Sequence, residues 1–398
     1  LDDNSVLESK IQFDLEHENY DLTTSFEMYE TLNGDNSDRY QYVLPNYNFS
    51  KNFSLDNIKG SFNLNSYGNN TLNATNVVTS SISNDLNYYA KDKFFNSGIK
   101  TNFEISLKNI NTIAKNNPTY KNSPQSELMS AYIYNASLPL IKKNSKTINT
   151  LEPKLSLRFS PHEMKNNTSV SRRIDVSNVF SFNRLSLGNS FEEGESITLG
   201  LNFKKEKVNT NNKIDEIEEY IDFKLASVFR LEEEKNIPTN STLNKKNSNI
   251  FGQFNFKPTK NISLGYNFSL TDDLNTFEYN SLITTMEFGN FITQFDYLEE
   301  RGTVGSANII QNTTKYDFDD QNSISFNTRR NRKLNLTEYY DLVYEYKNDC
   351  LVAGIKYKKN YYNDADIKPV EELFFSITIV PLGTFSPDKM ILNKDRLD

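Results

Sequence analysis

Cysteine and histidine are the residues that most often carry catalysis or hold a metal, and this chain has very few of them. Cys350 is the single cysteine, and His17 and His162 are the two histidines. One thiol and two distant imidazoles do not form a zinc site of familiar spacing. A Ser-His-Asp triad would have to use one of these histidines, and no nucleophile-elbow motif accompanies either. We therefore expect no catalytic residue, no metal, no cofactor and no enzymatic activity.

The charge pattern excludes another class of function. The chain has 52 acidic and 44 basic residues, a net charge of −8. The two signs are interspersed, so the sequence offers no basic stripe for nucleic acid. The acidic run "LEEEK" at 231–235 is interpreted as a solvated loop.

The elements around Cys350 must be strands. The chain has 28 Phe and 23 Tyr but only 5 Met, a bias that favours strands. Apolar and polar residues alternate in many segments, such as "IQFDLEH", where Ile11, Phe13 and Leu15 share one face. We count about nineteen such segments of roughly 8–13 residues, and no run of about 18 apolar residues that would predict a membrane helix.

Segment length separates the possible all-β folds. Strands of soluble proteins run about 5–6 residues, whereas transmembrane strands need about 9–11. The sequence thus predicts an all-β protein: a large antiparallel transmembrane β-barrel of the outer-membrane type. One segment is irregular, because "YIDFKLASVFRL" at 220–231 places Ile221, Phe223 and Leu225 on the apolar face, and then Val228 and Leu231 after a phase slip near Ser227.

The connections predict the orientation. Short turns such as "KND" at 347–349 alternate with long polar stretches at 114–127 and 207–218. Outer-membrane barrels have short periplasmic turns and long outer loops, so both long stretches are expected on the outer side. Both ends of a bacterial barrel usually lie in the periplasm. The last strand, 371–382, would then end there, and "KND" would be a periplasmic turn.

The strand phase predicts which side chains face the lipid. Cys350 would face the lumen beside the "KND" turn. In an oxidising periplasm, a lone cysteine there either has a disulfide partner elsewhere or is an exposed free thiol. The residues expected to face the lumen are Cys350, Gly354, Lys356, Lys358, Ser376 and Thr378. Those expected to face the lipid are Tyr340, Leu342, Tyr344, Tyr346, Leu351, Ala353, Ile355, Tyr357, Leu373, Phe375, Ile377 and Ile379.

Three stretches resemble the LptD family of LPS-assembly outer-membrane proteins. They are "TLEPKLSLRFSP" (150–161), "SRRIDVSNVFSFNRLSLGNSFEEGESITLGLNF" (171–203) and the segment 336–382. The second departs from the family pattern at Asn189-Ser190, where many members have Asp-Arg. The residues that match the family's loop-and-strand pattern are Asp175, Asn178, Phe180, Asn183, Arg184, Gly188, Glu193, Gly194, Thr198, Leu199, Gly200 and Leu201.

The resemblance implies a translocon that inserts lipopolysaccharide into the outer leaflet of a Gram-negative outer membrane through a lateral seam. It implies periplasmic Lpt bridge proteins as partners through an N-terminal jelly-roll domain, a plug lipoprotein LptE, and outer-membrane lipid around the barrel. The chain begins abruptly at "LDDNSVLESK". We therefore expect 1–398 to be the C-terminal portion of one barrel domain, with 383–398 as a C-terminal tail and the first strands upstream.

The resemblance also assigns two sites. In the family, a pair of adjacent cysteines in such a turn is linked to cysteines of the N-terminal domain, and Asp349-Cys350 matches that pattern with one cysteine lost. Cys350 is then either disulfide-bonded to an upstream cysteine or an unpaired structural residue. Pro381 either weakens the seam by removing a ladder bond or merely ends the strand. The predicted seam residues are Phe374, Ser376, Thr378, Val380 and Pro381.

Two other functions fit the same alternation. A porin or substrate-specific channel would be a closed barrel with no periplasmic partner. A soluble β-rich adhesin would need a second sheet to cover its apolar faces.

Overall fold

The structure is a computed structural model that describes residues 6–32, 39–74, 76–118, 120–209, 216–361, 370–379, 383–385 and 390–391. In this part of the chain, strands account for nearly all regular structure, and the one helical element is a single 3₁₀ turn, η1 (Thr239–Ser241). None of these residues forms a helix long and apolar enough to cross a membrane. The all-β prediction is confirmed.

The strands belong to one sheet. Nineteen of those described have nine or more residues, and four have two to four. They are β1 (Val6–His17), β2 (Tyr20–Thr31), β3 (Tyr40–Leu55), β4 (Ile58–Asn73), β5 (Val77–Ala90), β6 (Lys93–Phe94), β7 (Lys100–Lys115), β8 (Gln125–Ser137), β9 (Leu140–Lys143), β10 (Thr147–Ser160), β11 (Gly194–Asn209), β12 (Glu216–Arg230), β13 (Ile250–Thr259), β14 (Ile262–Leu270), β15 (Phe277–Phe288), β16 (Phe291–Glu300), β17 (Asn308–Asp317), β18 (Asn322–Asn331), β19 (Leu336–Lys347), β20 (Leu351–Asn360), β21 (Val370–Ile379), β22 (Gly383–Phe385) and β23 (Met390–Ile391).

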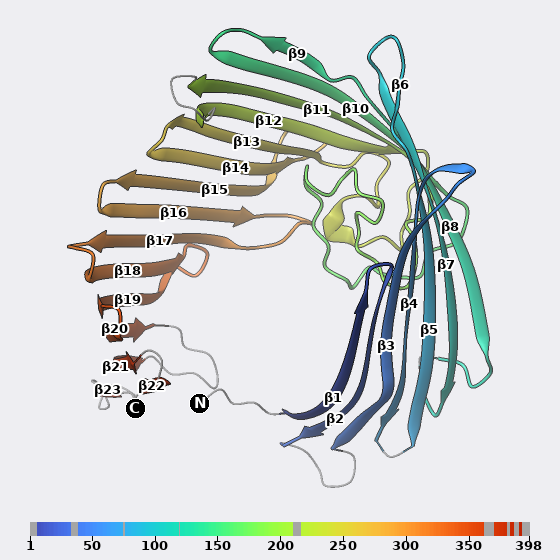
Figure 1. The fold of residues 1–398 in the computed structure, drawn as a ribbon, viewed down its shortest axis with the longest axis horizontal. Coiled ribbons are helices and arrows are strands. Elements are labelled where there is room, and N and C mark those ends of the chain that lie inside the picture. The colour runs from blue at the N-terminus through green and yellow to red at the C-terminus, as the bar shows by residue number, and fades with distance from the viewer. Residues whose placement is uncertain are drawn as a thin grey trace.

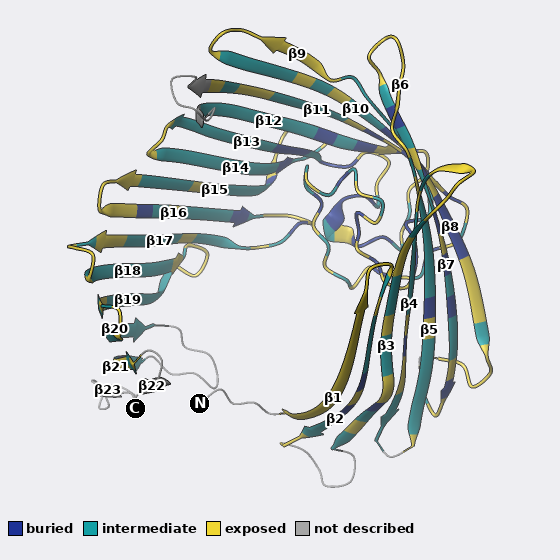
Figure 2. Ribbon diagram, in the orientation of Figure 1, coloured by how far each residue is buried: buried dark blue, intermediate teal, exposed yellow. Residues whose placement is uncertain are grey.

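The long strands form an antiparallel up-and-down meander that curls around a lumen (Figure 1). Within the described ranges β1 pairs only with β2, and β21 pairs with β20 and with the short β22 and β23. The curled sheet therefore has two edges, β1 and β21, that are not paired with each other. Figure 2 shows that β1 is exposed along its whole length.

The register near the C-terminal edge confirms the predicted strand phase. Ile355 of β20 lies opposite Tyr344 of β19 and Phe375 of β21, and these three side chains are 40–44% exposed on the outer face. Lys356, on the opposite face, forms an ion pair with Asp341 across a distance of 3.0 Å. The apolar side chains thus face outward and the charged ones face the lumen.

The predicted phase slip in β12 is wrong. Its register with β11 is continuous from Glu219 to Arg230, so Ala226 and Val228 share the inner face with Arg230. Ala226 is 4% exposed and Val228 is fully buried. These two inner positions can be apolar because lumenal loops, described below, cover them and exclude water.

The placement of both long polar stretches on one side is also wrong. Successive connections of a meander alternate between the two ends of the sheet. The stretch 114–127 joins β7 to β8, and 207–218 joins β11 to β12, three connections later, so the two lie at opposite ends. Half of 207–218 is strand, because β11 extends to Asn209 and β12 begins at Glu216.

Candidate functional site in the lumen and at the sheet edge

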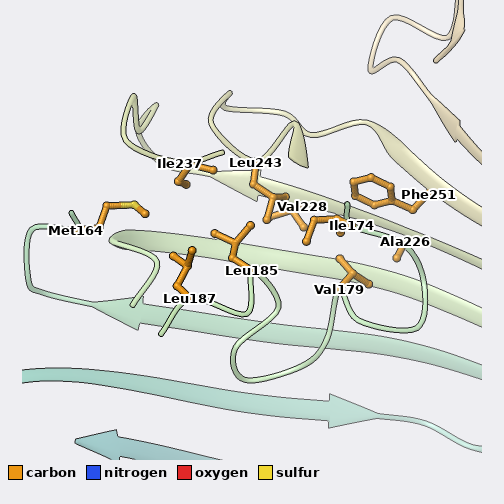
Figure 3. Packing of buried hydrophobic residues seen from close by; sticks show 10 residues of the cluster. All are labelled: Met164, Ile174, Val179, Leu185, Leu187, Ala226, Val228, Ile237, Leu243 and Phe251. Carbon is orange, nitrogen blue, oxygen red and sulfur yellow. The ribbon is translucent and has the colours of Figure 1, made fainter. Parts of the chain in front are cut away.

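Two connections fold into the lumen. We call residues 161–193, between β10 and β11, the inner loop, and residues 231–249, between β12 and β13, the companion loop (Figure 1). Together with inner-face residues of β12 and β13 they form an apolar core (Figure 3). Its members are Met164, Ile174, Val179, Leu185, Leu187, Ala226, Val228, Ile237, Leu243 and Phe251.

The inner loop also packs against the strands on the other side of β10, which pairs directly with β8. Phe191 forms a second buried cluster with Ile110 of β7 and with Met129 and Ala131 of β8, and Phe182 packs against it. The inner loop is therefore a folded plug that contacts the wall on two sides.

Three residues of the family motif shape the turns of the inner loop. The Asp175 carboxylate accepts hydrogen bonds from the backbone N–H groups of Ser177 (2.7 Å) and Asn178 (3.2 Å), which closes a tight turn. The Asn178 side chain accepts the backbone N–H of Asp175 at 3.0 Å. The Asn183 amide accepts the Leu187 N–H and donates to the Leu187 carbonyl, each at 3.0 Å. These side chains replace a regular backbone ladder.

Phe180 and Gly200 form the motif's contact between loop and wall. A Cβ atom at Gly200 would lie 2.5 Å from the Phe180 ring, so the ring occupies the space that glycine leaves open. The Lys154 ammonium of β10 lies 4.9 Å from the ring centroid, within range of a cation–π contact. Gly188 has no comparable constraint: it contacts the wall through its carbonyl, which accepts the Tyr67 hydroxyl at 3.3 Å.

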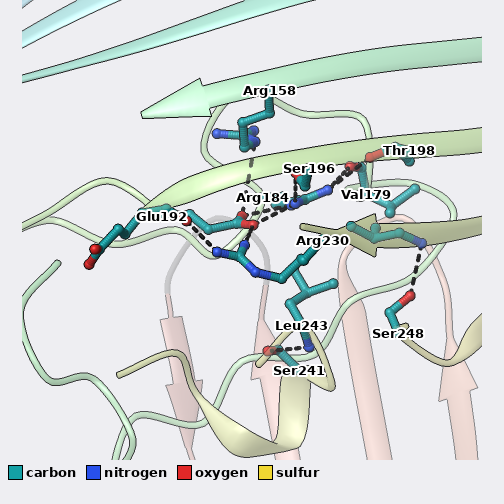
Figure 4. Close-up of polar contacts among 12 residues, drawn as sticks. Arg158, Val179, Arg184, Glu192, Ser196, Thr198, Arg230, Ser241, Leu243 and Ser248 are labelled. Atoms are coloured by element: carbon teal, nitrogen blue, oxygen red, sulfur yellow. Dashed lines mark hydrogen bonds and ion pairs between the residues drawn. The ribbon is translucent and has the colours of Figure 1, made fainter. Parts of the chain in front are cut away.

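Arg184 is the motif residue with the most contacts. Its guanidinium binds both carboxylate oxygens of Glu192, at 2.7 and 2.5 Å (Figure 4). It also donates to the hydroxyls of Ser196 (3.0 Å) and Thr198 (2.9 Å), on the inner face of β11. Arg184 is 3% exposed and Glu192 is 4% exposed. The pair therefore joins two parts of the inner loop to each other and to the wall.

Two more arginines converge on the same carboxylate. Arg230 of β12 contacts Glu192 at 2.6 Å, and Arg158 of β10 lies 4.0 Å from it while donating to the inner-loop carbonyls of Ser181 and Phe182. We call Arg158, Arg184, Glu192 and Arg230 the arginine cluster.

The three positive charges control the ionisation of Glu192. Burial raises the pKa of its carboxyl, but the charge and hydrogen bonds of Arg184 and the charges of the other two arginines outweigh burial and lower the pKa to about 2. Glu192 is therefore an anion at neutral pH. The cluster's contacts join the inner loop to β10, β11 and β12, so the cluster fixes the inner loop in place.

Single contacts tie the inner loop to the remaining wall. Arg173 forms an ion pair with Glu300 of β16, and its guanidinium lies 4.2 Å from the ring centroid of Tyr279 in β15. Lys165 pairs with Glu127 of β8 at 2.7 Å.

The edge strand β21 contains the predicted seam residues. Ser376 lies opposite Gly354, and Phe374 lies opposite Lys356, on the inner face. On the other edge of β21, β22 and β23 pair only with Ile377–Ile379 and Glu372–Leu373. On that edge, no described residue pairs with 374–376, whose other edge pairs with β20. Val380 and Pro381 lie outside the described residues.

Cys350 lies in the β19–β20 turn, as predicted. It is exposed, and its N–H donates to the Asn348 side chain at 3.0 Å. Its proposed disulfide partner would lie outside this chain, so the bond stays a prediction. The histidines have local contacts: His17 stacks on Tyr20, and His162 hydrogen-bonds to Ser130. Over the described residues, no group of three or more His, Cys, Asp or Glu side chains is arranged to hold a metal ion.

Sequence reasoning missed three members of the arginine cluster. It singled out Glu193, whereas the buried carboxylate belongs to the adjacent Glu192. Arg158 and Arg230 could have been predicted to face the lumen from strand alternation, because each lies at an inward position near the end of its strand where a lumenal loop begins. Their convergence on one carboxylate depends on the path of the inner loop, which strand alternation does not encode.

Comparison with known proteins gives one family and several solved structures. The model of the family "LptD: LPS transport system D" matches residues 1–329. No curated protein matches. The siderophore receptor PirA from Acinetobacter baumannii is 7% identical over 95% of this chain and 72% of its own, with a TM-score of 0.40. The ferric enterobactin receptor PfeA of Pseudomonas aeruginosa is 7% identical over 94% and 73%, with a TM-score of 0.37. The FrpB iron transporter of Neisseria meningitidis is 10% identical over 95% and 74%, with a TM-score of 0.34.

Proposed function

Since the chain belongs to the LptD family of LPS transport proteins, we propose that it inserts lipopolysaccharide into the outer leaflet through a lateral seam at the β21 edge. Its location is the outer membrane of a Gram-negative bacterium. The proposed donors are periplasmic Lpt bridge proteins, and the proposed lumenal partner is a plug lipoprotein of the LptE type. Its action on the lipid would be physical transfer without a catalytic step.

Two features of the sheet support this proposal. Its inner and outer faces differ in polarity, and its β21 edge has few strand partners among the described residues. The inner face carries charged and amide side chains suited to a phosphorylated sugar head, and the outer face is apolar. Acyl chains can leave such a lumen only where two strands separate. Separation breaks a ladder of backbone hydrogen bonds, so it is cheapest where the ladder is short. Among the described strands no long strand pairs with β21 on the edge away from β20, which supports that edge as the place.

The experiment places a photoreactive amino acid at Ser376 in the full-length protein and supplies lipopolysaccharide through the periplasmic bridge. Thr313 is the matched control, because it faces inward on β17, far from either edge. We expect lipopolysaccharide to crosslink at Ser376 during transport, well above the level at Thr313. Equal crosslinking at both positions would contradict the seam. A protein that conducts ions but releases no labelled lipopolysaccharide into a bilayer would be a channel.

A further inference from the structure

An aromatic row crosses the outer face of the wall from β3 to β8. The ring centroids of its first four members, Phe53, Phe62, Tyr88 and Phe103, are 4.8–5.5 Å apart in sequence order. Tyr134 of β8 lies directly opposite Phe103 of β7, and these two side chains are 43% and 41% exposed. Aromatic side chains gather where the wall of a barrel meets the boundary between lipid and water. The row therefore marks the level of one such boundary.

This boundary is the periplasmic one. The row lies near the β3–β4 and β5–β7 connections, and an even number of connections separates each of them from the β19–β20 turn. Successive connections of a meander alternate between the two ends of the sheet, so all three lie at the same end. That end faces the periplasm in a barrel of the outer-membrane type. The lipid beside the row consequently belongs to the inner leaflet, which is made of phospholipid, and not to the leaflet that receives lipopolysaccharide.

The β5–β7 connection continues past the row as a hairpin. Its short strand β6 places Lys93 opposite Thr101 and Phe94 opposite Lys100. Phe94 is 66% exposed, and the next residue, Phe95, is 45% exposed. The Lys93 ammonium lies 4.9 Å from the centroid of the Phe95 ring. Exposed phenylalanines beside a lysine are typical of a segment that lies in the membrane interface.

A hollow lies between the hairpin and the aromatic row, and its volume is about 1060 Å³. Its lining has an aromatic part and a basic part. The aromatic part consists of Tyr88, Phe94, Phe95, Phe103 and Tyr134, and the basic part consists of Lys59, Lys91 and Lys93. The hollow thus combines an apolar surface at the level of the lipid with positive charge at its periplasmic end.

The positive charge in the hollow is not balanced within its lining. Asp92 is the one carboxylate among the described lining residues. It already binds the Lys100 ammonium at 2.8 Å and accepts the Asn102 amide at 3.0 Å. Lys59 and Lys91 are held side by side, because the Lys91 N–H donates to the Lys59 carbonyl at 3.2 Å. Lysines grouped beside a membrane attract anionic lipid head groups.

We propose that this hollow binds the anionic phospholipid phosphatidylglycerol in the inner leaflet. An acyl chain lies against Tyr88 and Phe103, and the phosphodiester lies among the three lysines. The proposal rests on the outer-membrane location of the chain and does not depend on lipopolysaccharide transport. Its failure would therefore leave the β21 seam, which is tested at Ser376, unaffected.

The absence of tryptophan from this chain provides a direct test. Phe103→Trp places a fluorophore in the hollow, where brominated acyl chains quench it. Phe291→Trp is the matched control, because Phe291 is an outward phenylalanine at the periplasmic end of β16, 37% exposed against 41%. Its cross-strand neighbours are Phe288 and Tyr316, not lysines. Each full-length variant is reconstituted in phosphatidylcholine bilayers with increasing brominated phosphatidylglycerol, and the signal of the unmodified protein is subtracted.

At Phe103→Trp we expect quenching to exceed the bulk fraction of brominated lipid. The preference for phosphatidylglycerol over phosphatidylcholine should be at least roughly fivefold, the scale of one lysine beside an anionic lipid. At Phe291→Trp quenching should follow the bulk composition. Lys91→Gln together with Lys93→Gln should remove most of the preference, whereas Lys91→Arg together with Lys93→Arg should keep it, because the positive charge selects the lipid.

Equal quenching at the two tryptophan positions, or a preference that survives the glutamine substitutions, would overturn the proposal. Phe291→Trp combined with the same glutamine substitutions shows that the barrel remains inserted, because its quenching should not change. If the lysines instead bind an acidic periplasmic protein, the purified protein will show no preference for phosphatidylglycerol, and the proposal fails.

Discussion

Glu192 is the residue whose loss should release the inner loop from the wall. Its carboxylate is the single anion among three buried guanidinium groups, two of which belong to wall strands. Glu192→Gln keeps the size of the side chain and removes its charge. The three arginines then lose the carboxylate that compensates them and repel one another across a buried site.

The magnitude follows from burial. All four side chains of the arginine cluster are at most 7% exposed. Removing one partner of a buried ion pair costs about 3–5 kcal/mol, because the remaining charge is left uncompensated. The inner loop can avoid much of this cost by detaching, since β10–β12 keep their own backbone ladders. We therefore expect local opening of the inner loop to become about 10²–10³ times more frequent, with the barrel intact.

Limited trypsin digestion of the reconstituted protein measures this opening. Cleavage after Arg172 is suppressed in the folded loop, where Arg172 is held by the Leu185 carbonyl at 2.9 Å. When opening is fast relative to cleavage, the cleavage rate follows the population of the open state. The matched control is Glu193→Gln, because the hydrogen bond that this carboxylate accepts from the Met164 N–H is one that an amide oxygen also accepts. If the two variants are cleaved at the same rate, the arginine cluster does not hold the loop.

The same carboxylate gives the protein a pH dependence. The pKa of Glu192 is about 2 in the folded protein, against 4.5 for an ordinary glutamate. A lowered pKa contributes stability that is present above pH 4.5 and is lost as the pH falls towards 2, here on the order of 3 kcal/mol. Pepsin digestion across this window should show the inner loop opening in the native protein. Glu192→Gln should lack that step, and a native protein whose loop stays equally protected at pH 2 and pH 5 would contradict the assignment.

Three further experiments test the sheet, its contact with the inner loop, and the turn. Ile355→Arg places a charge on the lipid-facing side and should destabilise the folded barrel by about 2–4 kcal/mol in a folding titration in lipid. Gly354→Arg points into the lumen and should destabilise the barrel less. Equal destabilisation by the two substitutions would contradict the assigned strand phase. Gly200→Ala should cost about 1–3 kcal/mol in the same titration, because its Cβ would displace the Phe180 ring, and Phe180→Leu in the same chain should recover part of that loss. Cys350→Ser should abolish a reducible mobility shift of the full-length protein on a non-reducing gel and impair lipopolysaccharide delivery, with the barrel still inserted. Normal delivery and no shift in the native protein would leave Cys350 as a small residue in a turn.

Strand alternation predicted the wall because each wall position has one of two environments. Ile355 and Phe375 meet lipid, Lys356 meets the lumen, and the two-residue period separates them without reference to any other strand. The arginine cluster has no such period. Its four residues come from β10, β12 and two places in the inner loop. Only the path of the folded loop brings the Glu192 carboxylate within 4.0 Å of the three guanidinium groups. Motif matching found Arg184 because that residue lies within the stretch 171–203 that resembles the family, but it did not identify Glu192 as the partner of Arg184.

The wrong prediction of a phase slip in β12 has a physical explanation. An inward position should be polar where it meets water, and it becomes apolar only where protein covers it. Apolar inward residues follow one another at Met129, Ala131 and Ile133 of β8 and at Ala226 and Val228 of β12, and both groups include residues that pack against a lumenal loop. On β8 and β12 the break in alternation therefore marks where a lumenal loop covers the wall.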